Sequence, residues 1–322
     1  MQSAVKISAL ASFLPGKPFW RLCVIALLLC SLVGLLFPKH FFFDLFNHFR
    51  PQAVLGGVFL LWVTYLLKDR TFFFLALFII VLNVALMVFR LQAFSPQAPA
   101  ALSGETAPPR KIKIMSANVL TSNNDTQRII NLVREHNPEV FVALETDEKW
   151  RQALQALAIE YPFQATETRP DNFGMAVYAK EHFKSEILSV KAYDHHLPMI
   201  KADFGSFVVV AMHPPPPLSH MMHTINDSYI KKAVGAVEND ARPVFLVGDF
   251  NSTPWSGLVD SLAVNGFSLS GKGLTWTWPV GFFPLAINID HVFYRNATVS
   301  DHRALEDIGS DHFPVMVSAA FQ

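Results

Sequence analysis

The chain has 322 residues, enough for one large domain or two ordinary ones, and it balances 26 Lys and Arg against 26 Asp and Glu. Residues 1–110 carry 9 basic and 3 acidic residues, a net charge of +6, whereas residues 111–322 carry 17 and 23, a net charge of −6. An acidic second part argues against a strong non-specific grip on long duplex nucleic acid, for which basic surface dominates the affinity. Both cysteines, Cys23 and Cys30, lie in the first part, so we expect no structural zinc site in the second.

Three apolar runs occupy the first third of the chain, at residues 19–37, 53–67 and 71–89. A helix that crosses a bilayer needs about 20 apolar residues, which the first and third runs supply and the second approaches. A cleaved signal peptide is the alternative for the first run, but we find no small-x-small cleavage site after it, and two more apolar runs follow. We therefore predict a membrane anchor of three transmembrane helices within residues 1–91.

The basic residues near the ends of these runs predict an orientation. The N-terminal tail and the tip between the second and third runs carry five Lys and Arg, against three on the opposite side. This bias places the N-terminus in the cytoplasm and everything after Arg90 outside it. Residues 92–110, rich in Ala, Pro, Ser and Gly, predict a semi-extended linker.

The pattern changes from residue 111 onward to short strands with a few helices. Apolar or alternating stretches predict strands at residues 111–116, 140–144, 174–178, 187–190, 199–202, 207–212, 243–247, 273–278, 286–293 and 315–319. Helical spacing predicts helices at 125–135 and 150–159, and a third through 258–264 that Thr253 would cap and Pro254 would open. We expect the His pairs at 195–196 and 220–223 to be loop residues rather than metal ligands. Many strands with few helices indicate an α/β domain with mixed sheets.

Polar residues cluster beside the predicted strands. They are Asn118, Glu145, His213, Asp249 with Asn251, Asp290 with His291, and Asp311 with His312. Each alone has a local explanation, such as a turn residue, a helix cap or a buried histidine. Nearly all, however, follow an apolar run, where a sheet delivers side chains to one rim. Their shared placement therefore favours a single site.

These motifs resemble the endonuclease/exonuclease/phosphatase superfamily. The resemblance rests on Asn118, Leu144-Glu145, Met212-His213, Gly248-Asp249-Phe250-Asn251, Ile289-Asp290-His291-Val292-Phe293 and Ser310-Asp311-His312-Phe313-Pro314-Val315, which occur in the family's order. The chain is similar to bacterial members anchored in the membrane. The resemblance implies a catalytic domain over residues 111–322 that folds as a four-layer α/β sandwich of two mixed sheets. Combined with the charge bias, it predicts a multi-pass inner-membrane protein whose catalytic domain is periplasmic.

The reaction implied is hydrolysis of a phosphate ester by in-line attack of water, with Mg²⁺ as the cofactor and Mn²⁺ as the alternative. A hard cation takes oxygen ligands and few carboxylates. We expect Glu145 to be the first ligand, with Asn118 beside it and Asp311 as a further or second-ion ligand.

The resemblance also implies the roles of the remaining residues. Asp249 would orient or deprotonate the attacking water, and Asn251 would hydrogen-bond the phosphate. His213 and His312 would flank the phosphate and stabilise the charge that develops there, while Asp290 would hold the imidazole of His312 in one tautomer. His291 should point to the opposite face of its strand, and we assign it no chemistry.

The substrate is left open, since the family spans nucleases, inositol phosphate phosphatases and sphingomyelinase-like lipid phosphodiesterases. The anchor, which would contact membrane lipid, and the apolar residues 282–285 favour lipid-like or small phosphoesters, although core packing explains those residues equally well. The tetraproline at 214–217 predicts either a pocket wall or a rigid connector. The alternatives are a nuclease, or a catalytically silent binding module on a membrane anchor. No protein partner is inferred.

Overall fold

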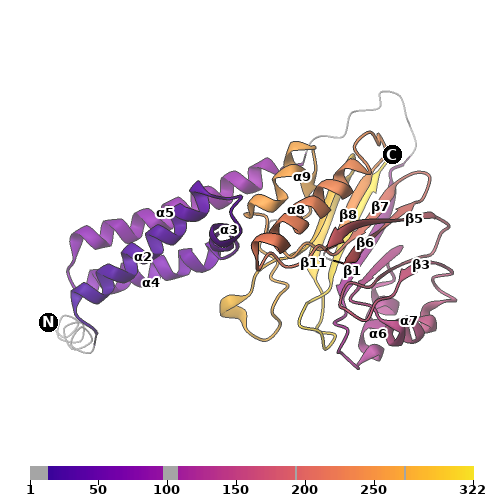
Figure 1. Cartoon of the computed structure of the whole chain (residues 1–322), viewed down its shortest axis with the longest axis horizontal. Helices are drawn as coiled ribbons and strands as arrows, with labels where there is room; N and C mark the ends of the chain where they lie inside the picture. Colours follow the sequence, from indigo (N-terminus) through magenta and orange to yellow (C-terminus); the bar gives the residue numbers. More distant parts are fainter. Residues whose placement is uncertain (1–13, 97–107, 193, 272) are drawn as a thin grey trace. The chain divides into compact units, whose positions relative to one another are not determined.

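A computed structural model describes residues 14–96, 108–192, 194–271 and 273–322. Lys6 of the charge count and residues 97–107 of the expected linker lie outside the described residues. The chain divides into two compact units, Met1–Arg90 with Trp255–Gly257, and Leu91–Pro254 with Leu258–Gln322. The first unit is helical, and the second combines sheets with helices (Figure 1).

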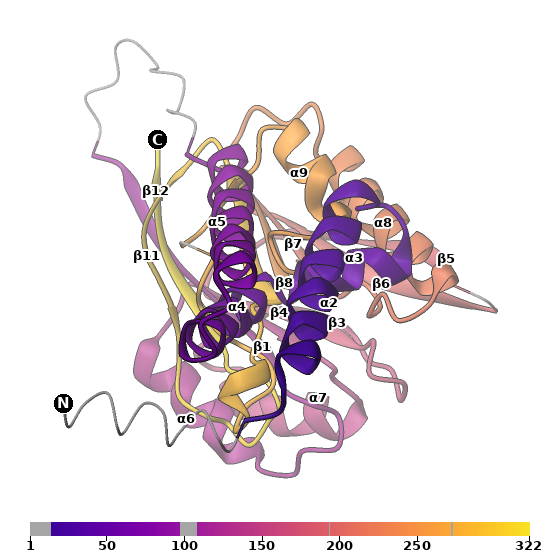
Figure 2. The same cartoon turned by 90° about the vertical axis from the view of Figure 1, so that its left-hand side faces the viewer.

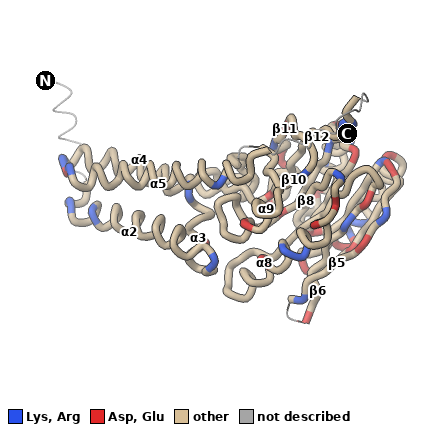
Figure 3. The backbone as a smooth tube through the Cα atoms, turned by 90° about the horizontal axis from the view of Figure 1, so that it is seen from above, with Lys and Arg blue, Asp and Glu red and all other residues tan. Residues whose placement is uncertain are grey.

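The first unit contains the helices α2 (Lys17–Leu36), α3 (Phe41–His48), α4 (Arg50–Leu66) and α5 (Arg70–Ala93). Its described Lys and Arg residues gather near helix ends, while the long helical stretches between them are uncharged (Figure 3). By length and composition, α2 and α5 can each cross a membrane, and α3 and α4 together form a third candidate that bends by 66°. Two spans or three are therefore compatible with this unit. Helix α3 was not expected from the sequence.

Polar side chains pair with one another inside this apolar unit. Asn83 on α5 donates to Ser31 Oγ on α2 at 2.9 Å, and Arg50 Nη1 donates to Asn83 Oδ1 at 3.0 Å. Polar residues facing the interior of an apolar helix bundle are stabilised by such hydrogen bonds between helices. These contacts therefore tie α2, α4 and α5 together.

The second unit is built on two six-stranded sheets. The first has the order β11-β12-β1-β2-β4-β3 and the second β5-β6-β7-β8-β10-β9. The strands are β1 (Arg110–Asn118), β2 (Val140–Leu144), β3 (Phe163–Glu167), β4 (Met175–Ala179), β5 (Lys184–Ala192), β6 (His195–Asp203), β7 (Val208–Met212), β8 (Val244–Asp249), β9 (Ser268–Leu269), β10 (Asp290–Arg295), β11 (Thr298–Ala304) and β12 (Val315–Phe321). The pairs β1–β2 and β7–β8 are parallel, and the other neighbours are antiparallel. Both sheets are therefore mixed, as expected.

The two sheets pack face to face with helices outside (Figures 1 and 2). Residues such as Ile114 and Val142 of one sheet and Val209 and Val247 of the other share a buried core. Helices α6 (Thr126–His136) and α7 (Glu148–Leu154) pack on the outer face of the first sheet. Helices α8 (His220–Gly235) and α9 (Asp260–Val264) pack on the outer face of the second. The unit is thus an α/β sandwich of two mixed sheets.

Helix α8 was not expected, and the histidines at 220 and 223 lie on it rather than in a loop. Ser219 caps it, because its Oγ accepts a hydrogen bond from Met222 N at 3.2 Å. His195 and His196 open β6 and are likewise not loop residues. The histidines interrupted the apolar pattern, so that α8 was missed and β6 was predicted only at residues 199–202.

Three further expectations about secondary structure were wrong. Thr253 and Pro254 do not open a helix, because the chain first makes a 3₁₀ turn at Gly257–Val259 and α9 begins at Asp260. Residues 273–278 form no strand in the described part and contribute a single bridge between Trp278 and Ile287. The edge strands β3 and β11 were missed because their outward faces are polar and lack a continuous apolar run.

Candidate active site

The parallel strand pairs bring four of the expected residues to one rim. Strand β1 ends at Asn118 beside Leu144, the last residue of β2, and Glu145 follows immediately. In the second sheet β7 ends at Met212, paired with Gly248, so that His213 and Asp249 leave the sheet together. Parallel neighbours end at the same edge, which explains each local pair.

Asp290 and His312 reach this rim by a different route. Asp290 is the first residue of β10 and His312 precedes β12, so neither lies at the end of its strand, where nearly all site residues were expected. Strand β10 runs antiparallel to β8 and places Asp290 opposite Asp249. Strand β12 runs antiparallel to β1, with Val315 opposite Ser116, so His312 lies just beyond the edge. The start of an antiparallel strand meets the end of its neighbour.

Side chains from both sheets meet around Oδ2 of Asp249. His213 Nε2 lies 3.5 Å from this oxygen and His312 Nε2 lies 3.7 Å from it. Asn118 Nδ2 donates to Glu145 Oε1 at 2.9 Å and lies 3.4 Å from Asp249 Oδ2. All five residues are largely buried. The structure therefore gathers residues spread over almost 200 positions into one cluster.

Asp290 fixes the orientation of His312. Its Oδ2 lies 2.8 Å from His312 Nδ1, which donates the hydrogen bond, so Nε2 is the nitrogen that faces Asp249. The Asp290 backbone N–H donates to Thr277 Oγ1 at 3.3 Å, which holds the start of β10 in place. A carboxylate behind an imidazole selects one tautomer in this way.

The charges in the cluster stabilise one another. Burial lowers the pKa of His312, but the carboxylates of Asp290 and Asp249 outweigh it and raise that pKa to about 10. Burial also opposes protonation of His213, yet hydrogen bonding and charge attraction from Asp249 raise its pKa above the ordinary value. For Asp249, burial raises the pKa, but the two histidines outweigh it and lower it. The cluster thus favours protonated imidazoles around an ionised Asp249.

Asn251 and Asp311 lie at the rim but outside this central contact. Asn251 donates its backbone N–H to Asp249 Oδ1 at 2.7 Å and its side-chain Nδ2 to Pro214 O at 3.0 Å. Asp311 accepts a hydrogen bond from Trp278 Nε1 at 3.0 Å on Oδ2. Its Oδ1 is buried and has no hydrogen-bond partner among the described residues.

His291 faces away from the cluster, as its place on the strand indicates. Its Nε2 lies 3.0 Å from Ser252 O, and its ring packs against Phe250 and Phe293. Burial lowers its pKa to about 4, so it is neutral at ordinary pH. This histidine is part of the packing.

Thr277 and Trp278 are the residues that sequence reasoning missed. Thr277 supports Asp290, and Trp278 binds Asp311 and places its ring centroid 6.4 Å from that of His312. They belong to an uncharged stretch before Asp290 that was taken for a strand. The available signal was the pair of tryptophans, Trp276 and Trp278, that the chain places upstream of Asp290.

Two sets of residues offer ligands for a cation. Asp249, Asp290 and His312 place one ligand atom each within 4.8 Å of one another. His312 donates its Nδ1–H to Asp290 and, when protonated, carries a second proton on Nε2. In that form neither nitrogen can ligate a metal, so this first set does not suit a cation. Asn118, Glu145 and Asp311 instead supply oxygen atoms, the ligand type that hard divalent cations take.

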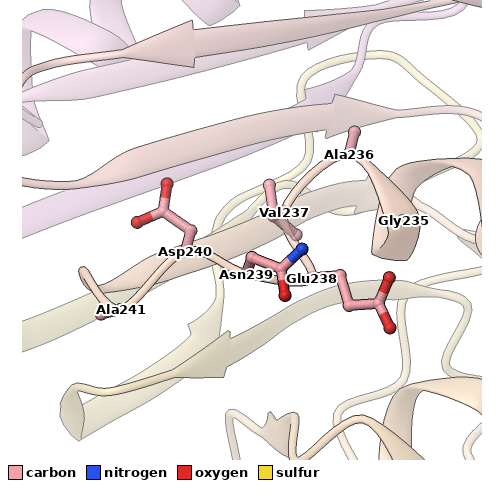
Figure 4. Close-up of a pocket in the computed structure, with 7 residues that line it drawn as sticks. All are labelled: Gly235, Ala236, Val237, Glu238, Asn239, Asp240 and Ala241. Carbon is pink, nitrogen blue, oxygen red and sulfur yellow. The ribbon is translucent and has the colours of Figure 1, made fainter.

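A separate pocket lies near the start of β8, at the end of the second sheet opposite to the cluster. It is lined by Gly235–Ala241, between α8 and the start of β8 (Figure 4). Asp240, one of its two acidic residues, is paired with Arg242 at 2.7 Å. Because Asp249 ends the same strand, this pocket is remote from the cluster.

The family model for the endonuclease/exonuclease/phosphatase family matches residues 115–312. The chain belongs to this family. Every site residue expected from the sequence, from Asn118 to His312, falls within the matched range. Membership makes the second unit a hydrolase of a superfamily whose members generally cleave phosphoesters. No curated protein matches the chain.

Solved structures of low identity share the fold. A humanized D. rerio TDP2 with 14 mutations matches with a TM-score of 0.55 at 15% identity, covering 65% of this chain and 98% of that chain. An endonuclease/exonuclease/phosphatase from Bacteroides vulgatus matches at 0.54 and 15%, covering 66% and 100%. One from Beutenbergia cavernae matches at 0.52 and 18%, covering 66% and 72%. At these identities the likeness establishes the sandwich alone.

Proposed function

We propose that the chain is a divalent-metal-dependent phosphodiesterase, anchored in a membrane, that hydrolyses lipid-like or small phosphoesters by in-line attack of water. One observation carries the proposal: His213 and His312 converge on a single carboxylate oxygen of Asp249, with Glu145 and Asn118 alongside. A binding module has no need of a carboxylate and two imidazoles arranged to handle protons. This contact argues against a catalytically silent domain.

Glu145, Asn118 and Asp311 would hold Mg²⁺, or Mn²⁺ in its place. The fit rests on unsatisfied oxygen atoms: Asp311 Oδ1 is buried with no hydrogen-bond partner among the described residues. Glu145 Oε2 receives only a long contact, 3.5 Å from Thr121 N. Glu145 also sits at φ +61°, a backbone conformation that few non-glycine residues adopt and that is enriched at functional sites. When bound, the ion would neutralise charge on the phosphoryl oxygens.

Asp249 would accept a proton from the attacking water. Its lowered pKa keeps it ionised and able to orient the water, and Asn251 N–H fixes its other oxygen. Protonated His213 and His312 would donate to the phosphoryl oxygens as negative charge develops there. Asp290 would keep His312 in the required tautomer. The Asn251 amide, which now donates to Pro214 O, would contact the phosphate from the same rim.

The substrate preference rests on charge and on the apolar helices. The second part of the chain carries a net charge of −6, which disfavours the phosphate backbone of long nucleic acids. Helices α2 and α5, with the bent α3–α4 pair as a third candidate, support anchoring in an inner membrane, and the basic bias supports a periplasmic catalytic unit. A nuclease is the alternative, and D. rerio TDP2, which shares the fold, has been solved with a single-strand DNA product.

The decisive experiment measures hydrolysis of bis(p-nitrophenyl) phosphate by the full chain in detergent, with Mg²⁺ and after its removal by EDTA. We expect activity that requires the metal and falls about 10³-fold in Asp249→Ala and in His312→Ala. Asp227→Ala, a surface carboxylate paired with Lys231, is the matched control and should retain full activity. Unchanged hydrolysis in both site variants would reject the assignment.

Two further measurements test the class of substrate and the membrane topology, each on its own. Plasmid DNA and phospholipid vesicles, offered in parallel, distinguish the nuclease from the lipid phosphodiesterase. An alkaline phosphatase fused to the C-terminus should be active in intact cells if the catalytic unit is periplasmic. An inactive fusion that is nevertheless expressed would indicate that the catalytic unit lies in the cytoplasm.

A further inference from the structure

Residues 273–289 form a connection between β9 and β10 that no catalytic role accounts for; we call it the aromatic loop. It contains no Asp, Glu, Lys or Arg, but two Trp, two Phe, two Leu and two Ile. Figure 1 shows this segment, in gold, standing out from the strands with a short 3₁₀ turn at Phe283–Leu285. An uncharged connection of this length is unusual, since loops normally run through solvent.

The base of the aromatic loop is fixed to the catalytic rim. Trp278 Nε1 donates to Asp311 Oδ2 at 3.0 Å, and Val280 N donates to Asp311 O at 2.9 Å. Phe313 N donates to Thr277 O at 2.9 Å, directly after His312. These hydrogen bonds fix the base of the loop beside Asp311 and His312, so a molecule bound at the tip lies close to the cluster around Asp249.

The tip of the loop is exposed, which excludes core packing as its explanation. Phe283 is 69% exposed, Phe282 54% and Leu285 49%, and Leu274 nearby is 49% exposed. Trp276 braces the tip, with its ring centroid 6.1 Å from that of Phe283. Soluble surfaces rarely expose large apolar side chains in a group, and such groups mark interaction sites.

The second rim connection shows the same feature. It follows His213 and exposes Leu218 at 72%, and it leads into the first turn of α8, where Met221 is 46% exposed. Six of the nine large apolar side chains exposed in the described second unit lie on these two connections or on the first turn of α8. Apolar exposure in the described second unit is therefore concentrated on segments that adjoin His213 or the Asp290–His312 pair.

We propose that the tip of the aromatic loop inserts into the interface of a lipid bilayer and presents the phosphodiester of a membrane phospholipid to the cluster around Asp249. Amphipathic Trp beside Phe and Leu suits the boundary between headgroups and acyl chains. A bilayer is the partner that the chain's own apolar helices supply. Nucleic acid is disfavoured as the occupant, because single strands bind where cations accompany the aromatic rings, and this loop has none.

Insertion is tested without any assay of activity. The two cysteines, both on α2, are replaced (Cys23→Ser, Cys30→Ser), and Phe283→Cys carries an environment-sensitive NBD label. Ile159→Cys, 94% exposed on the α7 side of the sandwich, is the matched control. The full chain is reconstituted into phosphatidylcholine/phosphatidylglycerol vesicles that contain doxyl-labelled lipid. We expect a blue shift and lipid quenching at 283 and neither at 159. Equal emission and quenching at the two positions would overturn the proposal.

The substrate part of the inference rests on the proposed function, and activity tests it separately. The triple variant Phe282→Ser, Phe283→Ser, Leu285→Ser should hydrolyse vesicle phospholipid about tenfold or more slowly, as expected when at least about 1.4 kcal/mol of bilayer contact is lost. Its hydrolysis of bis(p-nitrophenyl) phosphate should stay at the wild-type rate. The control variant Ile159→Ser, Val264→Ser removes exposed apolar side chains elsewhere and should match wild type on both substrates.

The outcomes distinguish the two proposals. If wild type hydrolyses neither substrate, the proposed function fails, while the NBD readout still decides insertion. If the triple variant matches wild type on vesicles, or if it loses activity on plasmid DNA instead, the lipid-presenting role of the loop is wrong. An equal loss on the soluble substrate would likewise reject it, because the loop would then act on the catalytic cluster itself.

Discussion

Replacing Asp290 with Asn removes the charge behind His312 while keeping the size and shape of the side chain. The two groups are buried, with Asp290 Oδ2 and His312 Nδ1 2.8 Å apart. The new amide offers either an oxygen or an N–H group to Nδ1. In the second arrangement the imidazole is driven to the wrong tautomer, and Nε2 no longer carries the proton it needs to donate.

The size of the effect follows from this geometry. Opposite unit charges 2.8 Å apart attract by about 6 kcal/mol at an effective dielectric constant of about 20. Desolvation of both groups offsets part of this attraction, so that losing one charge of a buried pair costs about 2–5 kcal/mol. If the contact is fully formed in the transition state, about 3–4 kcal/mol corresponds to a fall in kcat/KM of about 10²–10³-fold.

The assay is hydrolysis of bis(p-nitrophenyl) phosphate by the full chain at saturating Mg²⁺. His291→Gln is the matched control, since His291 is the next residue on β10 and faces the other side. We expect the control to keep its kcat/KM even if its melting temperature falls. An Asp290→Asn protein that folds normally and retains more than about a third of wild-type kcat/KM would refute this role for the carboxylate.

The remaining predictions concern the metal and the stability of the fold. Glu145→Gln should raise the Mg²⁺ concentration for half-maximal activity by about tenfold or more, measured by titration; an unchanged requirement would remove Glu145 from the metal site. His291, with its pKa near 4, stays neutral in the folded state while the unfolded chain protonates it near pH 6.5, so this residue costs stability as pH falls from about 6.5 to 4. His291→Gln should make the denaturation profile flatter over that window by about 3 kcal/mol, and an identical profile would contradict the buried, neutral histidine. Gly248→Ala would place Cβ 2.0 Å from Met212 O at φ +147°, so we expect a loss of about 3 kcal/mol or more by thermal melting; a wild-type melting temperature would show that the β7–β8 pair can shift.

Much of the fold was accessible from the sequence because burial patterns are local. The strands at β2 and β8 are continuous apolar runs that periodicity identifies directly. Helix α8 escaped because its first turn contains two histidines, and its cap becomes evident only from the Ser219 hydrogen bond. Residues 273–278 of the aromatic loop were predicted to form a strand, but they contribute only the bridge between Trp278 and Ile287. Core packing was an open alternative for residues 282–285, whereas Phe282, Phe283 and Leu285 are exposed.

The candidate site was likewise predictable in part from local sequence and in part only from the tertiary structure. Asn118, Glu145, His213 and Asp249 could be predicted as neighbours in pairs, since each pair follows two adjacent parallel strands. Asp290 begins β10 and His312 precedes β12, and nothing local in the chain indicates that these strands run antiparallel to β8 and β1. The sequence also contained no signal that Asp311 accepts a hydrogen bond from Trp278.

The order of residue types along the chain was therefore sufficient to indicate the apolar helices, the mixed α/β class, the family and the candidate residues that the structure gathers around Asp249. These properties depend on hydrophobic periodicity and on short motifs, both of which are formed by residues close together in the sequence. Only the tertiary structure decided which side chains share Asp249 Oδ2, which carboxylate orients His312, and that Phe282 and Phe283 are exposed beside the rim. These properties depend on strand direction and on packing between the two sheets, which no single segment determines.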